Sequence, residues 1–228
     1  MATTEHQDAD YWYKPGPTVS EFHASKATIR VLIGGRGSGK TTAIAVDAVL
    51  KHAWLNAGAR TYVLRKTETS NQDTTVETFE QVFQQSGTAY LETESSLFRK
   101  KEGGRLYRLP SRKAVALYNQ FIETRPSKSA LERWLNVQGD KWCSFLLFSG
   151  VPTSSHRASR FRGFECSQLI LVEADQFDRE DVNMAGPCLR WKSPDPSVCD
   201  SKGFIRDQHI ILDTNPPGKR HWIAKWEE

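Results

Sequence analysis

Short, largely apolar runs alternate along the chain with segments of helical pattern. The runs cover residues 28–33, 61–65, 145–151, 168–172 and 208–213. Continuous apolar runs of this length are typical of strands that are buried on both faces of a parallel sheet. The Ala-rich segment 39–57 ends before Gly58, and Asp73 precedes a pattern in which Val76, Phe79, Val82 and Phe83 share one face, so both segments predict helices. The alternation predicts an α/β domain with a mainly parallel sheet flanked by helices.

The remaining segments are less regular. Residues 1–28 are polar and interrupted by Pro15 and Pro17, which predicts an N-terminal arm with little regular structure, followed by one domain over residues 29–228. Residues 97–109 predict a hairpin around Gly103 and Gly104, and residues 130–137 predict a short helix.

Composition excludes several classes of protein. The chain has 228 residues, of which 38% are hydrophobic and 11% aromatic, so it can bury a substantial core and is not a disordered chain. Four cysteines form neither a CxxC pair nor a dense disulfide framework, which indicates reduced thiols. The N-terminus has no signal-peptide pattern, and no run approaches the roughly 20 apolar residues of a membrane span. The net charge of +4 is compatible with a polyanionic partner.

A complete phosphate-loop motif follows the first apolar run. It consists of Gly34, Gly35, Arg36, Gly37, Ser38, Gly39, Lys40 and Thr41, with Thr42 next in the predicted helix. Glycines let the backbone N–H groups curl around a phosphate, and the helix N-terminus adds partial positive charge. In this motif the lysine reaches the β- and γ-phosphates and the Thr41 hydroxyl binds Mg²⁺, so the sequence predicts ATP and Mg²⁺ as ligands.

The apolar run 168–172 ends in acidic residues. A nucleotide hydrolase needs one carboxylate for Mg²⁺ and another to polarise the attacking water, usually as Asp-Glu at a strand end. Here Val172 precedes Glu173, and Ala174 separates Glu173 from Asp175. We predict Glu173 as the essential carboxylate, for catalysis and with Thr41 for the metal, and Asp175 as its helper; which carboxylate takes which task stays open.

The last apolar run leads into Thr214 and Asn215, followed by Pro216 and Pro217. A Thr or Asn at such a strand end can contact the γ-phosphate or its water. The alternative is an ordinary Asn-Pro turn.

These three signals, in this order, resemble the ATPase domain of the large terminase subunit of tailed bacteriophages. The resemblance extends to segments 13–17 and 22–25 before the loop, to residues 65–67 and 73–75, to Phe161-Arg162-Gly163, and to His221-Trp222. It covers roughly residues 11–226, loosely over 88–140. It implies a RecA-like (ASCE) P-loop fold and an ATPase that moves double-stranded viral DNA into a procapsid.

The same resemblance implies a homo-oligomeric ring, contacts with portal and small terminase subunit, no membrane, and the cytoplasm of an infected bacterium. The family also carries a C-terminal nuclease domain of RNase H-like fold. This sequence ends at Glu228, and we expect no nuclease activity from it.

Arginines are further candidates, because phosphoryl transfer needs positive charge on the γ-phosphate. Arg162 resembles the family's trans-acting arginine finger, with Arg157 and Arg160 as rivals and Arg36 able to act in cis. Arg65, at a strand end, is a candidate for organising the site. Residues 99–133 hold ten Lys or Arg against three acids, a net charge of +7 that suits a DNA or subunit contact or, alternatively, a solvated hairpin.

Two other functions are compatible with the sequence. The incomplete acidic motif would also suit a regulatory nucleotide-binding module that hydrolyses ATP poorly. A small-molecule P-loop kinase is a third reading, but no lid-like arginine cluster supports it. Tyr11, Tyr13 and His23 are candidates either for framing the adenine or for packing.

Overall fold

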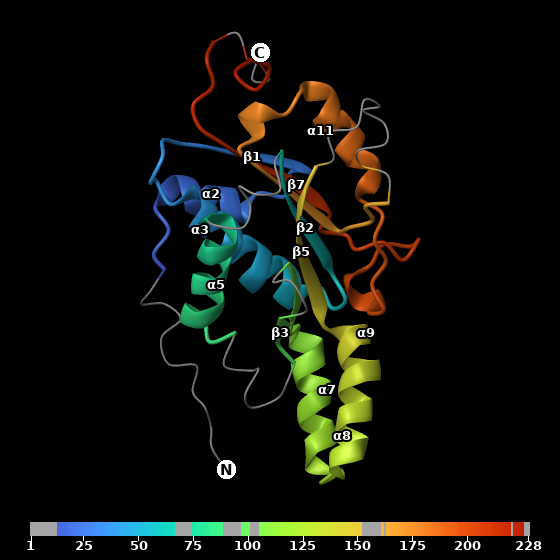
Figure 1. The fold of residues 1–228 in the computed structure, drawn as a ribbon. Coiled ribbons are helices and arrows are strands. Elements are labelled where there is room, and N and C mark those ends of the chain that lie inside the picture. Colours follow the sequence, from blue (N-terminus) through green and yellow to red (C-terminus); the bar gives the residue numbers. More distant parts are fainter. Residues whose placement is uncertain are drawn as a thin grey trace.

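The computed structural model describes residues 13–66, 74–88, 97–100, 105–151, 161, 163–219 and 221–225. Its centre is a seven-stranded sheet in the order β1-β7-β6-β2-β5-β4-β3 (Figure 1). The strands are β1 (Ile29–Ile33), β2 (Arg60–Arg65), β3 (Arg99–Lys100), β4 (Leu106–Leu109), β5 (Ser144–Gly150), β6 (Gln168–Val172) and β7 (His209–Thr214). Pairing is parallel from β1 through β5 and antiparallel at β4 and β3, so the predicted mainly parallel α/β sheet is confirmed.

Helical elements cover both faces of the sheet and extend below it. The longer ones are α2 (Pro17–Ala24), α3 (Lys40–Val46), the π-helical η1 (Asp47–Ala53), α5 (Val76–Gln85), α7 (Arg112–Glu123), α8 (Lys128–Trp134), the π-helical η4 (Leu135–Gly139) and α11 (Arg179–Ala185). Short ones are α9 (Asp140–Trp142), η5 (Ala174–Gln176), η6 (Gly186–Cys188) and η7 (Pro196–Val198). Helices α7, α8 and α9 form the arm that leaves the sheet at the bottom of Figure 1.

Two apolar layers follow from the alternation of side chains along each strand. On one face, Ile170, Val172 and Ile211 pack with residues of α3 and α5. On the other, Leu169, Leu171 and Leu212 pack with residues of η5 and α11. Both layers contain fully buried side chains, which explains why the strand sequences are apolar throughout rather than alternating. Within the described residues, no helix has the length and apolar character needed to cross a membrane.

The predicted elements are mostly present. Strand β6 has the predicted bounds, and segment 39–57 is helical as α3 and η1. The hairpin is present as β3 and β4, although the turn with Gly103 and Gly104 lies outside the described residues. Val76, Phe79, Val82 and Phe83 are the buried residues of α5, while Asp73 lies outside the described range.

One prediction is wrong: the described part of the N-terminal arm is structured. Residues 17–24 form α2, with Pro17 at its first position, where a proline favours a helix start because its missing N–H is not needed. Phe22 is buried in the layer beside α3, and Tyr13 and Val19 pack against the same layer. The folded unit therefore extends N-terminal of residue 29.

Candidate functional site

The phosphate loop connects β1 to α3 and takes the backbone geometry that its glycines allow. Gly37 and Gly39 have φ of 74° and 77°, a left-handed conformation that strains any residue with a Cβ. At Gly34, a Cβ would lie 2.8 Å from Ser38 Oγ, so the loop also closes tightly there. The Gly34 N–H donates to the Thr214 carbonyl at 3.2 Å, which ties the start of the loop to the end of β7.

Lys40 joins the loop to the end of β7. Its Nζ donates to the carbonyls of Gly34 and Gly35 at 2.6 and 3.0 Å and lies 3.5 Å from Asn215 Oδ1. It is also 3.9 Å from Asp213 Oδ1. The predicted loop lysine and the predicted strand-end asparagine therefore share one site.

Asp213 is a site residue that the sequence reasoning missed. The Thr41 hydroxyl donates to Asp213 Oδ2 at 3.4 Å, and Asp213 is only 5% exposed. Burial raises the pKa of Asp213 above its ordinary value, against the opposing charge of Lys40. Its place in the site can be recognised only from the strand order, because β7 lies directly beside β1 and so brings its last residues to the loop.

Glu173 follows β6 and has an unusual backbone for a residue with a side chain. Its φ of 56° is left-handed, a conformation that is uncommon outside glycine and concentrates at functional sites. One carboxylate oxygen accepts a hydrogen bond from Arg65, and the other accepts from Gln176 Nε2 at 2.7 Å. The predicted organising role of Arg65 thus has a direct contact: this arginine, at the end of β2, fixes the orientation of the Glu173 carboxylate.

Asp175 links the two strand ends. The Thr214 hydroxyl lies 3.2 Å from Asp175 Oδ1, and His221 Nε2 lies 3.1 Å from the Asp175 carbonyl oxygen. Among the described residues, the loop and the acidic segment are therefore both connected to the end of β7, which brings the three sequence signals to one edge of the sheet.

Other candidate residues fall outside this constellation. Arg157, Arg160 and Arg162 lie outside the described residues, so the arginine finger stays a prediction. Arg36 is exposed within the loop, and Thr42 lies half-buried in α3.

Two further sets of candidates contribute to packing. The Tyr13 hydroxyl bonds His23 Nε2 at 2.8 Å, and His23 Nδ1 lies 3.2 Å from Asp47, which supports packing rather than adenine binding. In the basic segment, Arg108 is 2% exposed and pairs with Asp140 at 2.6 Å, so it stabilises the fold and is not a DNA contact.

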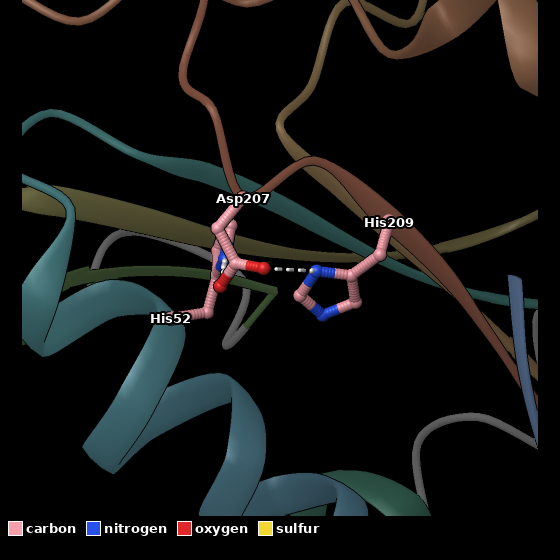
Figure 2. A group of neighbouring side chains, drawn as sticks. All are labelled: His52, Asp207 and His209. Atoms are coloured by element: carbon pink, nitrogen blue, oxygen red, sulfur yellow. Dashed lines mark ion pairs between the residues drawn. The ribbon is translucent and has the colours of Figure 1, made fainter. Parts of the chain in front are cut away.

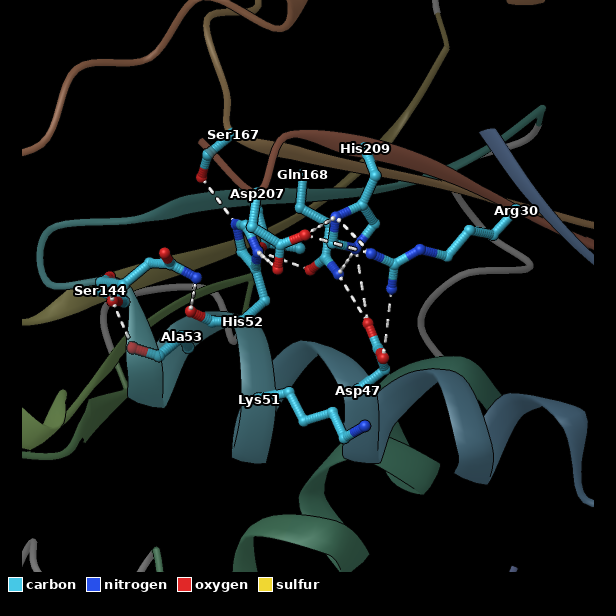
Figure 3. A network of polar contacts seen from close by, with 12 residues as sticks. Arg30, Asp47, Lys51, His52, Ala53, Ser144, Ser167, Gln168, Asp207 and His209 are labelled. Carbon is cyan, nitrogen blue, oxygen red and sulfur yellow. Dashed lines mark hydrogen bonds and ion pairs between the residues drawn. The ribbon is translucent and has the colours of Figure 1, made fainter. Parts of the chain in front are cut away.

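A second polar cluster lies at the opposite, amino end of the strands. His52, Asp207 and His209 bring potential metal-ligand atoms within 4.8 Å of one another (Figure 2). Figure 3 shows Arg30 beside them: its guanidinium donates to Asp207 at 3.2 Å and lies 3.3 Å from His209 Nδ1 and 3.5 Å from Asp47. Because this cation already contacts the carboxylate and the imidazole, the cluster is a charge network that holds η1 against β1 and β7.

The charges of this network are shifted by their neighbours. Burial of Asp47 opposes its ionisation, but hydrogen bonds with His209 and His23 and the charge of Arg30 hold its pKa well below the usual range. Hydrogen bonds with His209 and His52 likewise hold the pKa of Asp207 far below its usual range. Burial of His209 works against its protonated form, yet the two carboxylates raise its pKa above the ordinary value.

A glycine loop between a parallel strand and a helix, with Lys and Thr at the helix start, gives this chain the fold of a P-loop protein. The family model of the phage terminase large subunit matches residues 26–107. The resemblance predicted from the sequence is thereby confirmed, and the fold agrees with it.

Solved structures give the same fold. The large terminase from a thermophilic bacteriophage is similar at a TM-score of 0.55 and 13% identity, over 96% of this chain and 40% of that chain. The same phage's large terminase in complex with ADP is similar at a TM-score of 0.53 and 14% identity, over 95% of this chain and 39% of that chain. The chain thus spans about 40% of the length of the first of these terminases. No curated protein matches it.

Proposed function

We propose that this chain is an ATP-hydrolysing motor domain that drives double-stranded viral DNA into a procapsid. The observation that carries the proposal is the convergence of Lys40 with Asp213 and Asn215 at the phosphate loop. The match of residues 26–107 to the terminase large subunit supports it, as does the fold shared with a thermophilic-phage terminase solved in complex with ADP.

Each residue has a role that follows from its chemistry. The loop N–H groups and Lys40 bind the β- and γ-phosphates, and the Thr41 hydroxyl is an oxygen ligand for Mg²⁺. When bound, Mg²⁺ neutralises charge on the β- and γ-phosphate oxygens. Glu173, oriented by Arg65, polarises the attacking water as a general base. Asp175 and Thr214 transmit the state of the site from the acidic segment to β7.

The DNA contact in this proposal is the helical arm. Six basic side chains are exposed on it or on the strand leading to it: Arg105, Arg112, Lys113, Arg125, Lys128 and Arg133. Such a surface grips phosphates of any sequence, which suits a motor that must move a whole genome. In this proposal the domain works as a ring of identical subunits with portal and small terminase subunit, in the cytoplasm of an infected bacterium.

The test is ATP turnover with and without double-stranded DNA. We expect turnover to rise with DNA, Lys40→Ala to lose nucleotide binding and turnover, and Glu173→Gln to bind ATP without cleaving it, because an amide cannot accept the proton of water. Lys202→Ala, an exposed lysine in a turn away from the loop, is the matched control and should behave like the unchanged protein. Full turnover in a folded Lys40→Ala protein would refute the motor function. ATP binding with no turnover under any condition would favour the regulatory module.

A further inference from the structure

The acidic strand lacks a carboxylate where a P-loop hydrolase usually holds its metal. Val172 occupies the position before Glu173. Its side chain is 3% exposed and packs in the apolar layer beside α3. Valine has no atom that can bind a hard cation, so β6 cannot supply the metal ligand at this position.

The neighbouring strand carries a carboxylate at the same level. Val172 and Asp213 are register partners of the parallel strands β6 and β7, and Asp213 is in turn the partner of Leu32 in β1. Register partners in a parallel sheet point to the same face. Asp213 therefore faces α3 from one strand nearer to the phosphate loop than Val172.

The contacts of the two candidate carboxylates differ. Asp213 lies against the loop, 3.4 Å from the Thr41 hydroxyl and 3.9 Å from Lys40 Nζ. Glu173 instead contacts Arg65 and Gln176 through its two oxygens. A hydroxyl and a buried carboxylate side by side are the hard oxygen donors that Mg²⁺ prefers, so these residues fit the ion.

We propose that Asp213 supplies the magnesium carboxylate of this site, moved by one strand from the usual position, and that Glu173 is left free to act on water. The inference rests on the proposed function, because Mg²⁺ enters such a site with a nucleotide. The competing explanation is that Asp213 only positions Lys40 through their ion pair.

Nucleotide binding separates the two explanations without any measurement of turnover. ADP affinity is measured by calorimetry on the full chain, once with excess Mg²⁺ and once in EDTA. For Asp213→Asn we expect a loss of roughly 10–100-fold with Mg²⁺, the scale of a weakened metal site, and little change in EDTA. Asp200→Asn, in an exposed turn, is the control and should keep the full effect of Mg²⁺.

Two further variants keep the test decisive if Asp213→Asn misfolds, because each is expected to gain a property that a misfolded protein would not show. In Asp213→Cys a soft thiolate replaces the carboxylate, so Cd²⁺ should support ADP binding better than Mg²⁺, the reverse of the unchanged protein. Val172→Asp combined with Asp213→Asn returns the carboxylate to β6 and should restore the effect of Mg²⁺.

The outcomes are distinct. Equal loss of affinity with Mg²⁺ and in EDTA, together with no change of metal preference in Asp213→Cys, would overturn the proposal in favour of Lys40 positioning. An unchanged effect of Mg²⁺ in folded Asp213→Asn would also overturn it while leaving the motor function intact. Failure of the unchanged protein to bind ADP at all would remove the proposed function and this inference together.

Discussion

Replacing Arg30 by methionine should destabilise the domain strongly, because it removes the cation of a buried charge network. The guanidinium lies 3.5 Å from Asp47 Oδ2 and 3.2 Å from Asp207 Oδ1. The side chains of Arg30 and Asp47 are 4% and 2% exposed, whereas that of Asp207 is 38% exposed. Methionine keeps most of the apolar stem but leaves the buried Asp47 carboxylate without the charge of Arg30, while Asp207 remains accessible to water.

Breaking a buried pair by removing one partner costs about 3–5 kcal/mol, since the remaining charge stays desolvated. Asp47 keeps its contacts with His23, His209 and Gln168, so we expect the lower end, about 3 kcal/mol. For a domain of this size, 1 kcal/mol corresponds to about 2–4 °C, which gives a fall in melting temperature of ~6–12 °C.

The free energy of unfolding is measured by urea denaturation followed by circular dichroism. Arg190→Met is the matched control: its pair with Glu165 has a similar distance of 3.1 Å, but the two side chains are 55% and 48% exposed. Such a pair contributes at most about 1 kcal/mol. The double variant Arg30→Met/Asp47→Asn should recover part of the lost free energy of unfolding, because the uncompensated negative charge of Asp47 is then gone. Equal, small losses in Arg30→Met and Arg190→Met would refute the reasoning.

Three other predictions concern the charge network, the phosphate loop and the arginine finger expected from the sequence. The free energy of unfolding should fall on the alkaline side as the pH rises from 6.5 through the raised pKa of His209, and on the acid side as the pH drops from 3.8 towards the lowered pKa values of Asp47 and Asp207. His209→Gln should flatten the alkaline side and also weaken the acid-side dependence, because it removes hydrogen bonds that lower the pKa values of both aspartates. Gly39→Ala should weaken ADP binding and cost about 1–2 kcal/mol of stability because φ is 77°, whereas Gly35→Ala, with open space around it, should be tolerated. In turnover assays under conditions that assemble the proposed ring, Arg162→Ala should lose ~10³-fold or more of the turnover rate and regain activity when mixed with excess Lys40→Ala protein. Full activity of Arg162→Ala alone would exclude Arg162 as the finger.

The strands were predictable because burial on both faces of the sheet requires a continuous run of apolar residues. Residues 168–172 are all buried, so the apolar run and the strand coincide. The loop was equally clear, since its glycines and Lys40 stand at fixed spacing between a strand and a helix.

The arm of helices was harder to predict because its residues make few buried contacts. In α7 only Ala114 is buried, but Ala114, Leu117, Tyr118 and Phe121 recur at helical spacing, a pattern that the sequence reasoning missed. A second signal was the N-cap: Ser111 accepts a hydrogen bond from the Ala114 N–H and follows a proline. In α2 a proline acted as a helix start, whereas it was interpreted as an interruption.

The site also depends on an order of strands that local sequence does not contain. Strand β7 comes last along the chain but lies between β1 and β6, which places its end beside the loop. Thr214 and Asn215 were found by their motif, whereas Asp213 ends an apolar run and becomes a site residue only through its neighbour Thr41.

The phosphate-loop contact and the charge network lie at opposite ends of the same helical segment, α3 and η1, and of the same strand, β7. At the start of α3, Thr41 contacts Asp213 near the end of β7; further along, Asp47 and His52 of η1 meet His209 at the start of β7. His209 and Asp213 are four residues apart and therefore point to the same face of the strand. A shift of the helix along β7 would break the charge network and the loop contact together. The buried charges at the amino end thus help to hold the helical segment that carries Lys40 and Thr41 in its position along β7.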